Sequence, residues 1–209
     1  MTPLKRLTRL LLTVLATAAF AVPAALAAPV EYVLDATASQ ASFLIGENLL
    51  GRENTAVGTT NVVTGGVSID GDDPTALSFQ VFTVDVSTVT TDDRMRDGQI
   101  RNNILQTNRA GNATVTFAPA SVEGLELPLV AGTTQTVRLT GDLTIKGVTR
   151  TVVFDLDLEV VSDGELRGTA STVVKLTDFD ISVPRVPLVA RVDEDVQLVL
   201  DFRLVAGQE

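Results

Sequence analysis

Few residues of this sequence are suited to covalent chemistry. The 209 residues include no cysteine and no histidine, which excludes a thiol nucleophile, a zinc site built on Cys or His, and a serine triad that uses histidine. The adjacent carboxylates Asp92 and Asp93 are better explained by the dipole of a helix that begins there than by glycoside hydrolysis. We therefore expect a protein that is not an enzyme, binds no metal and needs no cofactor.

The residues best suited to bind a polar head group lie just beyond these carboxylates. Arg94, Arg96 and Arg101 lie close in sequence to Asp97, and a guanidinium can grip a phosphate or a polarised quinone oxygen. Arg94 and Asp97 are the leading head-group candidates. Because these two are three residues apart on a predicted helical turn, the alternative is that they pair with each other or brace one end of the fold.

The elements that must position these residues are mainly strands. Residues 28–209 contain 28 valines and 23 threonines, and β-branched side chains fit a pleated sheet better than a helix. Apolar and largely acidic positions alternate from Val152 to Val160, which is typical of a strand with one buried face. Similar alternation predicts about eight strands, and a short helical segment is expected near residues 92–105. The fold class is therefore all-β and antiparallel, as a barrel or a two-layer sandwich.

The apolar faces of these strands predict what lies inside. An eight-stranded barrel has an interior that side chains can just fill or that can hold one small ligand. Gly65, Gly141 and Gly168 fall on inward faces and would leave space there, whereas the alternative is that five phenylalanines meet and fill the middle. The residues expected to line a ligand-holding lumen are Phe43, Phe79, Val115, Phe117, Leu139, Phe154, Leu156, Leu198, Leu200 and Phe202.

Two longer segments are candidates for the mouth of such a barrel. The segment 46–58 carries Leu49 and Leu50 between charged residues. The segment 181–195 contains two prolines among apolar residues and is long enough for a lid. A strand-like edge that covers packed apolar residues is an equally good interpretation of this second segment.

The first 27 residues predict a cleaved secretory signal peptide. Three basic residues precede an apolar run over residues 10–22, and the small-residue stretch 24–27 fits a cleavage site. This run is too short for a spanning helix, which needs about 20 apolar residues. Loss of the three positive charges would change the net charge from −10 to −13. We therefore expect residues 28–209 to form one soluble, secreted or periplasmic barrel domain with no transmembrane segment, and its acidity argues against a nucleic-acid partner.

Several motifs resemble the YceI-like family of secreted bacterial proteins. The segment 141–150, with the sequence GDLTIKGVTR, resembles the family's G-x-L-T-I-x-G-x-T-[RK] hairpin. Tyr32 stands where the family often has tryptophan, and a histidine that is common after the family's Arg-Asp pair is absent. The other matching segments, which follow in family order along the chain, are 32–43, 87–97, 113–117 and 176–181.

The resemblance implies an extended, lipocalin-like antiparallel barrel whose apolar lumen holds a polyisoprenoid or an isoprenoid-quinone-like lipid. It implies a binding protein for transport, storage or sequestration of that lipid, and a homodimer is compatible with it. Two alternatives stay open at this point. One is a ligand-free β-sandwich that serves as a structural or adhesion module of the cell envelope, and the other is an enzyme that acts on a lipid.

Overall fold

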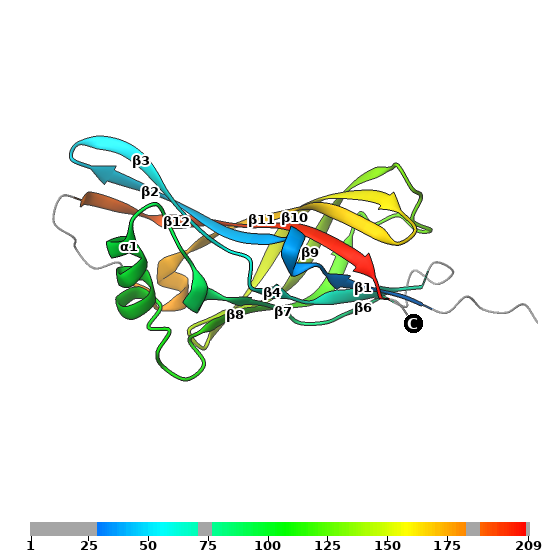
Figure 1. Ribbon diagram of the computed structural model, residues 1–209, viewed down its shortest axis with the longest axis horizontal. Helices are drawn as coiled ribbons and strands as arrows, with labels where there is room; N and C mark the ends of the chain where they lie inside the picture. Colours follow the sequence, from blue (N-terminus) through cyan, green and yellow to red (C-terminus); the bar gives the residue numbers. More distant parts are fainter. Residues whose placement is uncertain (1–28, 71–76, 183–188, 208–209) are drawn as a thin grey trace, which may run out of the picture.

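The computed structural model describes residues 29–70, 77–182 and 189–207, and in these residues twelve strands form one antiparallel sheet (Figure 1). The predicted leader, residues 1–27, lies outside the described residues. Among the described helices, none is long and apolar enough to cross a membrane. The strands are β1 (Val30–Leu34), β2 (Gln40–Leu49), β3 (Arg52–Thr60), β4 (Val63–Thr64), β5 (Gly66–Ile69), β6 (Ser78–Phe79), β7 (Phe82–Asp85), β8 (Thr114–Glu123), β9 (Thr134–Ile145), β10 (Val148–Ser162), β11 (Glu165–Lys175) and β12 (Val189–Ala206).

The twelve strands belong to eight passes of the described chain, because short breaks divide the first three passes. β1 and β2 form the first pass and are separated by the 3-10 turn η1 (Ala36–Ala38). The second pass contains β3, β4 and β5, and Gly65 between the last two has a φ of 148°, a conformation that favours glycine. β6 and β7 form the third pass, and each strand from β8 to β12 is a pass of its own. The prediction of about eight strands is therefore confirmed.

Each pass pairs with the next, and the last pass pairs with the first, so the sheet curls into a barrel. β8 to β12 pair in chain order, and β12 then pairs with both β2 and β1. On the other side, β7 pairs with β8 and β4. At the tip of the β2–β3 hairpin, β3 has β2 as its one neighbour in the described sheet, so this part of the barrel is half open. The two-layer sandwich is wrong, because one continuous sheet runs around the molecule.

A short helix lies at the half-open end, beside the β2–β3 hairpin (Figure 1). It begins as α1 (Arg94–Gln99) and continues into the π-helical turn η3 (Ile100–Ile104), which confirms the helical segment expected near residues 92–105. The Asp93 side chain accepts hydrogen bonds from the backbone N–H groups of Met95 and Arg96, and it therefore caps the start of α1. The remaining described helical turns are η2 (Val86–Thr88) and η4 (Leu176–Phe179).

The period of two in the sequence separates the inside of the barrel from the outside. On β10, Leu158 and Val160 are buried, whereas Asp157 and Glu159 between and before them are exposed. Val160 packs with Leu166 of β11 in one large apolar cluster, and both side chains are only 1% exposed. A second cluster lies along the same interior and includes the buried Leu143. Burial of the apolar side chains in these two clusters supplies the main driving force for closing the sheet.

A charged cluster fastens the first pass to the last two. Arg203 on β12 donates one hydrogen bond to Asp35 and one to Glu165 on β11, each at 2.9 Å. The hydroxyl of Ser39 accepts a hydrogen bond from the backbone N–H of Arg203 at 3.0 Å. Asp35 and Ser39, which belong to the opening motif of the family resemblance, therefore hold the seam where the barrel closes.

This seam predicts a pH-dependent contribution to stability. The hydrogen bond from Arg203, with that from Arg167, lowers the pKa of Glu165 from 4.5 to about 2. Because the folded-state pKa lies below the unfolded-state pKa, the stabilising contribution is present above about pH 4.5 and is lost as the pH falls towards 2. We expect Glu165→Gln to lower the urea midpoint of unfolding at pH 7, and this difference from wild type should shrink below pH 4.5.

The matched control is Glu31→Gln. Glu31 is exposed and its side chain forms no hydrogen bond or ion pair with another described residue. Removing its charge should therefore leave the urea midpoint unchanged at pH 7 and at pH 3. An effect of Glu165→Gln that is the same at pH 7 and pH 3, or one that Glu31→Gln reproduces, would show that the Arg203 contact does not stabilise the seam.

Candidate ligand-binding cavity

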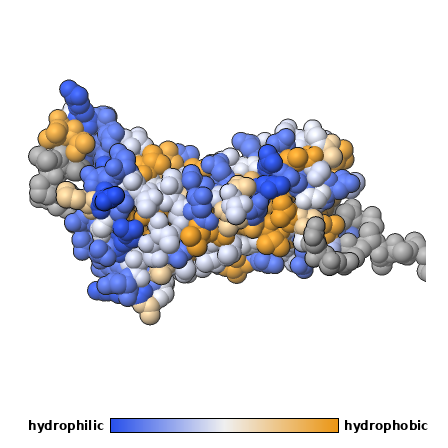
Figure 2. All heavy atoms as spheres, viewed as in Figure 1, coloured by the Kyte–Doolittle hydropathy of each residue, from blue (hydrophilic) through white to orange (hydrophobic). Residues whose placement is uncertain are grey.

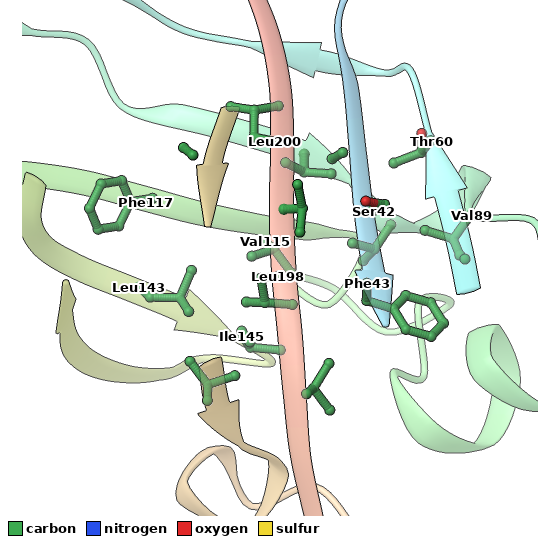
Figure 3. A pocket seen from close by; sticks show the side chains of 18 of the residues that line it. Ser42, Phe43, Thr60, Val89, Val115, Phe117, Leu143, Ile145, Leu198 and Leu200 are labelled. Carbon is green, nitrogen blue, oxygen red and sulfur yellow. The ribbon is translucent and has the colours of Figure 1, made fainter. Parts of the chain in front are cut away.

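The described part of the barrel encloses a cavity of about 870 Å³. Side chains from several strands border this common space, and Figure 3 shows among them Val115 of β8, Leu143 of β9 and Leu198 of β12. All ten residues that the sequence predicts for the lumen border the cavity: Phe43, Phe79, Val115, Phe117, Leu139, Phe154, Leu156, Leu198, Leu200 and Phe202.

The cavity is long as well as apolar. On β12 alone, the residues that border it run from Val192 to Leu204, a span of about 40 Å along an extended strand. Towards the seam its border includes Leu34 and Val67, and towards the half-open end it includes Leu49 and Met95. A space of this shape suits a long chain better than a compact ring system.

The phenylalanines border the cavity without filling it. Phe117 and Phe154 contact each other edge to face, with ring centroids 4.8 Å apart, and a cavity of about 870 Å³ still remains beside them. Phe43, Phe79 and Phe202 also lie at its border. The alternative in which these five side chains meet and fill the barrel is therefore wrong.

Glycines on neighbouring strands explain how such large rings leave the middle free. A β-carbon at any of four inward glycines would lie within 3 Å of a phenylalanine ring, so each ring occupies the place that a larger residue would take. The expectation that the glycines themselves leave empty space is therefore corrected: they let the rings lie back against the wall. The four pairs are Gly58 with Phe43, Gly65 with Phe82, Gly141 with Phe117, and Gly168 with Phe202.

Polar groups border the cavity mainly at the half-open end. Glu47 on β2 is only 6% exposed, and its carboxylate accepts hydrogen bonds from Arg96 of α1 at 2.9 Å and from Asn54 of β3 at 2.8 Å. The second terminal nitrogen of Arg96 donates to Asp92, which is exposed. A buried carboxylate needs such a partner, because an unpaired charge away from water is strongly unfavourable.

The predicted head-group pair, Arg94 and Asp97, does not border the cavity. Arg94 is exposed and forms no side-chain hydrogen bond or ion pair with another described residue. Asp97 is buried and accepts hydrogen bonds from the backbone N–H and the hydroxyl of Thr91, both at 2.7 Å. Burial alone would raise the pKa of Asp97, but the hydrogen bonds from Thr91 and the nearby arginine charges lower it below its ordinary value. Asp97 therefore braces the start of α1, and a head-group role for the pair stays a prediction.

The two predicted mouth segments have different outcomes. The segment 46–58 is the tip of the β2–β3 hairpin and not an open loop, and Glu47, Leu49, Ala56 and Gly58 of this hairpin border the cavity. In the segment 181–195, residues 183–188 lie outside the described residues. β12 begins at Val189, so the last part of that segment is a strand.

Sequence reasoning missed Glu47 as a residue of the cavity, although a signal was available. Ala41, Phe43 and Ile45 alternate on the inward face of β2, and Glu47 follows them in the same phase. Its partner Arg96 is 49 residues away and cannot be found from the strand pattern. In the described residues, no three Cys, His, Asp or Glu side chains come together in a way that could hold a metal ion.

Solved structures with the same fold are distant in sequence. A polyisoprenoid binding domain from Saccharophagus degradans, implicated in plant cell wall breakdown, is 18% identical, with a TM-score of 0.64 over 84% of this chain and 98% of that chain. BcnA of Burkholderia cenocepacia is 20% identical, with a TM-score of 0.61 over 83% of this chain and 99% of that chain. A YceI protein of Campylobacter jejuni is 18% identical, with a TM-score of 0.55 over 73% and 85% of the two chains. At these identities, the likeness shows the shared fold.

The family assignment comes from the sequence itself. No curated protein matches the chain significantly. The model of the YceI-like domain, in contrast, matches residues 32–204, which includes every pass of the barrel from β1 to the greater part of β12. This match and the eight-pass barrel confirm the resemblance carried by the GDLTIKGVTR hairpin, and the chain therefore belongs to the YceI-like family.

Proposed function

We propose that the protein is a secreted, non-enzymatic binding protein that holds a long-chain isoprenoid or a similar amphiphilic lipid in the barrel, for transport, storage or sequestration. In this proposal, residues 1–27 are removed as a signal peptide and residues 28–209 form the mature barrel. The ten lumen residues named above contact the lipid chain.

The observation that carries the proposal is the long apolar cavity. Its volume of about 870 Å³ lies near the upper end of the 300–1,000 Å³ that is typical of small-molecule sites. Each CH₂ group that it takes from water contributes about 0.8 kcal/mol, so a chain of several isoprene units gains enough free energy to offset the cost of ordering it. The Saccharophagus degradans domain of the same fold, which binds polyisoprenoids, supports the same class of ligand.

The test is native mass spectrometry of the mature protein, followed by organic extraction of what it holds. We expect the folded protein to retain a lipid of long apolar chain, and prenyl lipids added to the stripped protein to raise its melting temperature, because they bind the folded state alone. If the folded protein is free of ligand and neither prenyl lipids nor quinones change its melting temperature, the proposal fails and a structural role in the envelope is preferred.

A further inference from the structure

We infer that the half-open end of the barrel selects a lipid with an uncharged head group, such as an alcohol or a quinone carbonyl, over one with a phosphate, diphosphate or carboxylate. This inference rests on the proposed function, since it names the class of lipid that the same cavity accepts. It follows from the way in which the protein's own carboxylates neutralise the positive charge at this end and accept several of its hydrogen bonds.

Arg96 is the one basic residue among the described residues that border the cavity. Both of its terminal nitrogens are already bonded to carboxylates: one to Glu47 at 2.9 Å and the other to Asp92 at 2.5 Å. A guanidinium has five N–H donors, so what the two carboxylates take from an approaching phosphate is the positive charge of Arg96 and not every donor. The phosphate must either share a guanidinium that Glu47 and Asp92 already neutralise, and meet their charges, or displace one of them. Replacing Glu47 is strongly unfavourable, because its carboxylate is buried and would lose its charged partner.

The backbone donors at the start of α1 are occupied in the same way. The Asp93 carboxylate accepts from the backbone N–H of Met95 at 2.7 Å and from that of Arg96 at 3.2 Å. Asp97 accepts both the backbone N–H and the hydroxyl of Thr91. An anionic head group therefore finds these donors neutralised and meets the charges of the carboxylates that neutralise them.

The balance of charge points the same way. Three charged residues of the described chain border the cavity, the acids Glu47 and Asp93 and the base Arg96. The net charge of the border is therefore negative, even without the nearby Asp92. The face of the molecule in Figure 2 is largely hydrophilic around α1. Like charges in a partly buried site repel with an energy that a neutral head group does not meet.

Neutral polar groups remain for an uncharged head. Gln99, Asn102 and Asn103 of α1 and η3 border the cavity, and an amide both donates and accepts hydrogen bonds. Asn103 donates to Gln99 at 2.6 Å, whereas the side chain of Asn102 is exposed and forms no hydrogen bond with another described residue. Asn102 is therefore available to a hydroxyl or a carbonyl oxygen.

The experiment compares geranylgeraniol with geranylgeranyl diphosphate, which share one tail and differ in the head group. Both are titrated into stripped mature protein in the same detergent, and occupancy is measured by native mass spectrometry and by the shift in melting temperature. We expect the alcohol to bind at least about tenfold more tightly than the diphosphate, because only the diphosphate meets the repulsion.

A matched pair of variants tests whether the local charges are the cause. Glu47→Gln keeps the size and the hydrogen-bond acceptor but removes a negative charge beside Arg96, so we expect the affinity for the diphosphate, relative to that for the alcohol, to rise about tenfold. Asp157→Asn removes the same charge from the exposed face of β10 and should change neither the affinity for the diphosphate nor that for the alcohol. If Glu47→Gln does not fold, Asp92→Asn, at the exposed partner of Arg96, tests the same release.

Each outcome decides between the two proposals. Diphosphate binding that equals or exceeds alcohol binding in the wild type would overturn the selection of a neutral head. An equal gain in diphosphate affinity in Glu47→Gln and Asp157→Asn would show that the net charge of the protein, and not the half-open end of the barrel, is responsible. That result would also overturn the selection of a neutral head. If neither compound binds the folded protein, the proposed function fails.

Discussion

Leu156→Arg is expected to empty the cavity of lipid and to lower the free energy of unfolding. Leu156 borders the cavity and packs against both main apolar clusters. Its partners across the two neighbouring strands are Val137 and Ala170, and neither can pair with a guanidinium. An uncompensated charge in such a place costs about 3–5 kcal/mol. If that cost falls on the bound lipid, the affinity drops by two orders of magnitude or more.

The control for this prediction is the next residue on the same strand. Asp157 points to the opposite face of β10 and is exposed, so Asp157→Arg introduces the same side chain without burying it. We expect this variant to keep the lipid content, measured by native mass spectrometry, and the urea midpoint of the wild type. Normal lipid content and stability in Leu156→Arg, with both lost in Asp157→Arg, would show that the inward and outward faces are inverted, and normal values in both variants would show that neither position lines the lipid site.

The inward face of β10 illustrates what the sequence alone can predict. In a strand, successive side chains point to opposite faces, so the alternation from Val152 to Val160 determines which residues face the interior before any partner strand is known. The same rule places the ten predicted lumen residues at the border of the cavity. Closure into a barrel and not a sandwich depends on the pairing of β12 with β1 and β2, which periodicity does not contain.

The arginines of α1 illustrate what the sequence alone cannot predict. Residues two apart on an α-helix point about 200° apart, so a helix that turns Arg96 towards Glu47 must turn Arg94 away from the cavity. Which of the two faces inward depends on how α1 packs against the β2–β3 hairpin, whose strands lie some 40 residues earlier in the chain. Composition and spacing identify the basic helix, whereas the choice between Arg94 and Arg96 is made by tertiary packing.

The glycine and phenylalanine pairs are another feature that only the three-dimensional pairing of the strands reveals. They predict a large loss of stability when one of these glycines is replaced. A β-carbon at Gly168 would lie 2.1 Å from the backbone carbonyl oxygen of Asp157 and 2.9 Å from the ring of Phe202. The ring can move, but the carbonyl belongs to the ladder between β10 and β11. We therefore expect Gly168→Ala to lower the free energy of unfolding by about 3 kcal/mol, at the upper end of the cost of overpacking a core.

Gly164→Ala is the matched control, because it makes the same chemical change in the turn between the same two strands. A β-carbon there would lie 3.9 Å from that of Ala206, an ordinary contact, so its urea midpoint should stay close to that of the wild type. The comparison separates the close approach at Gly168 from the general effect of alanine on the unfolded chain, which is similar at both sites. Equal midpoints for the two variants would mean that the wall tolerates a larger residue at Gly168, and that the glycine and phenylalanine pairs do not set the width of the lumen.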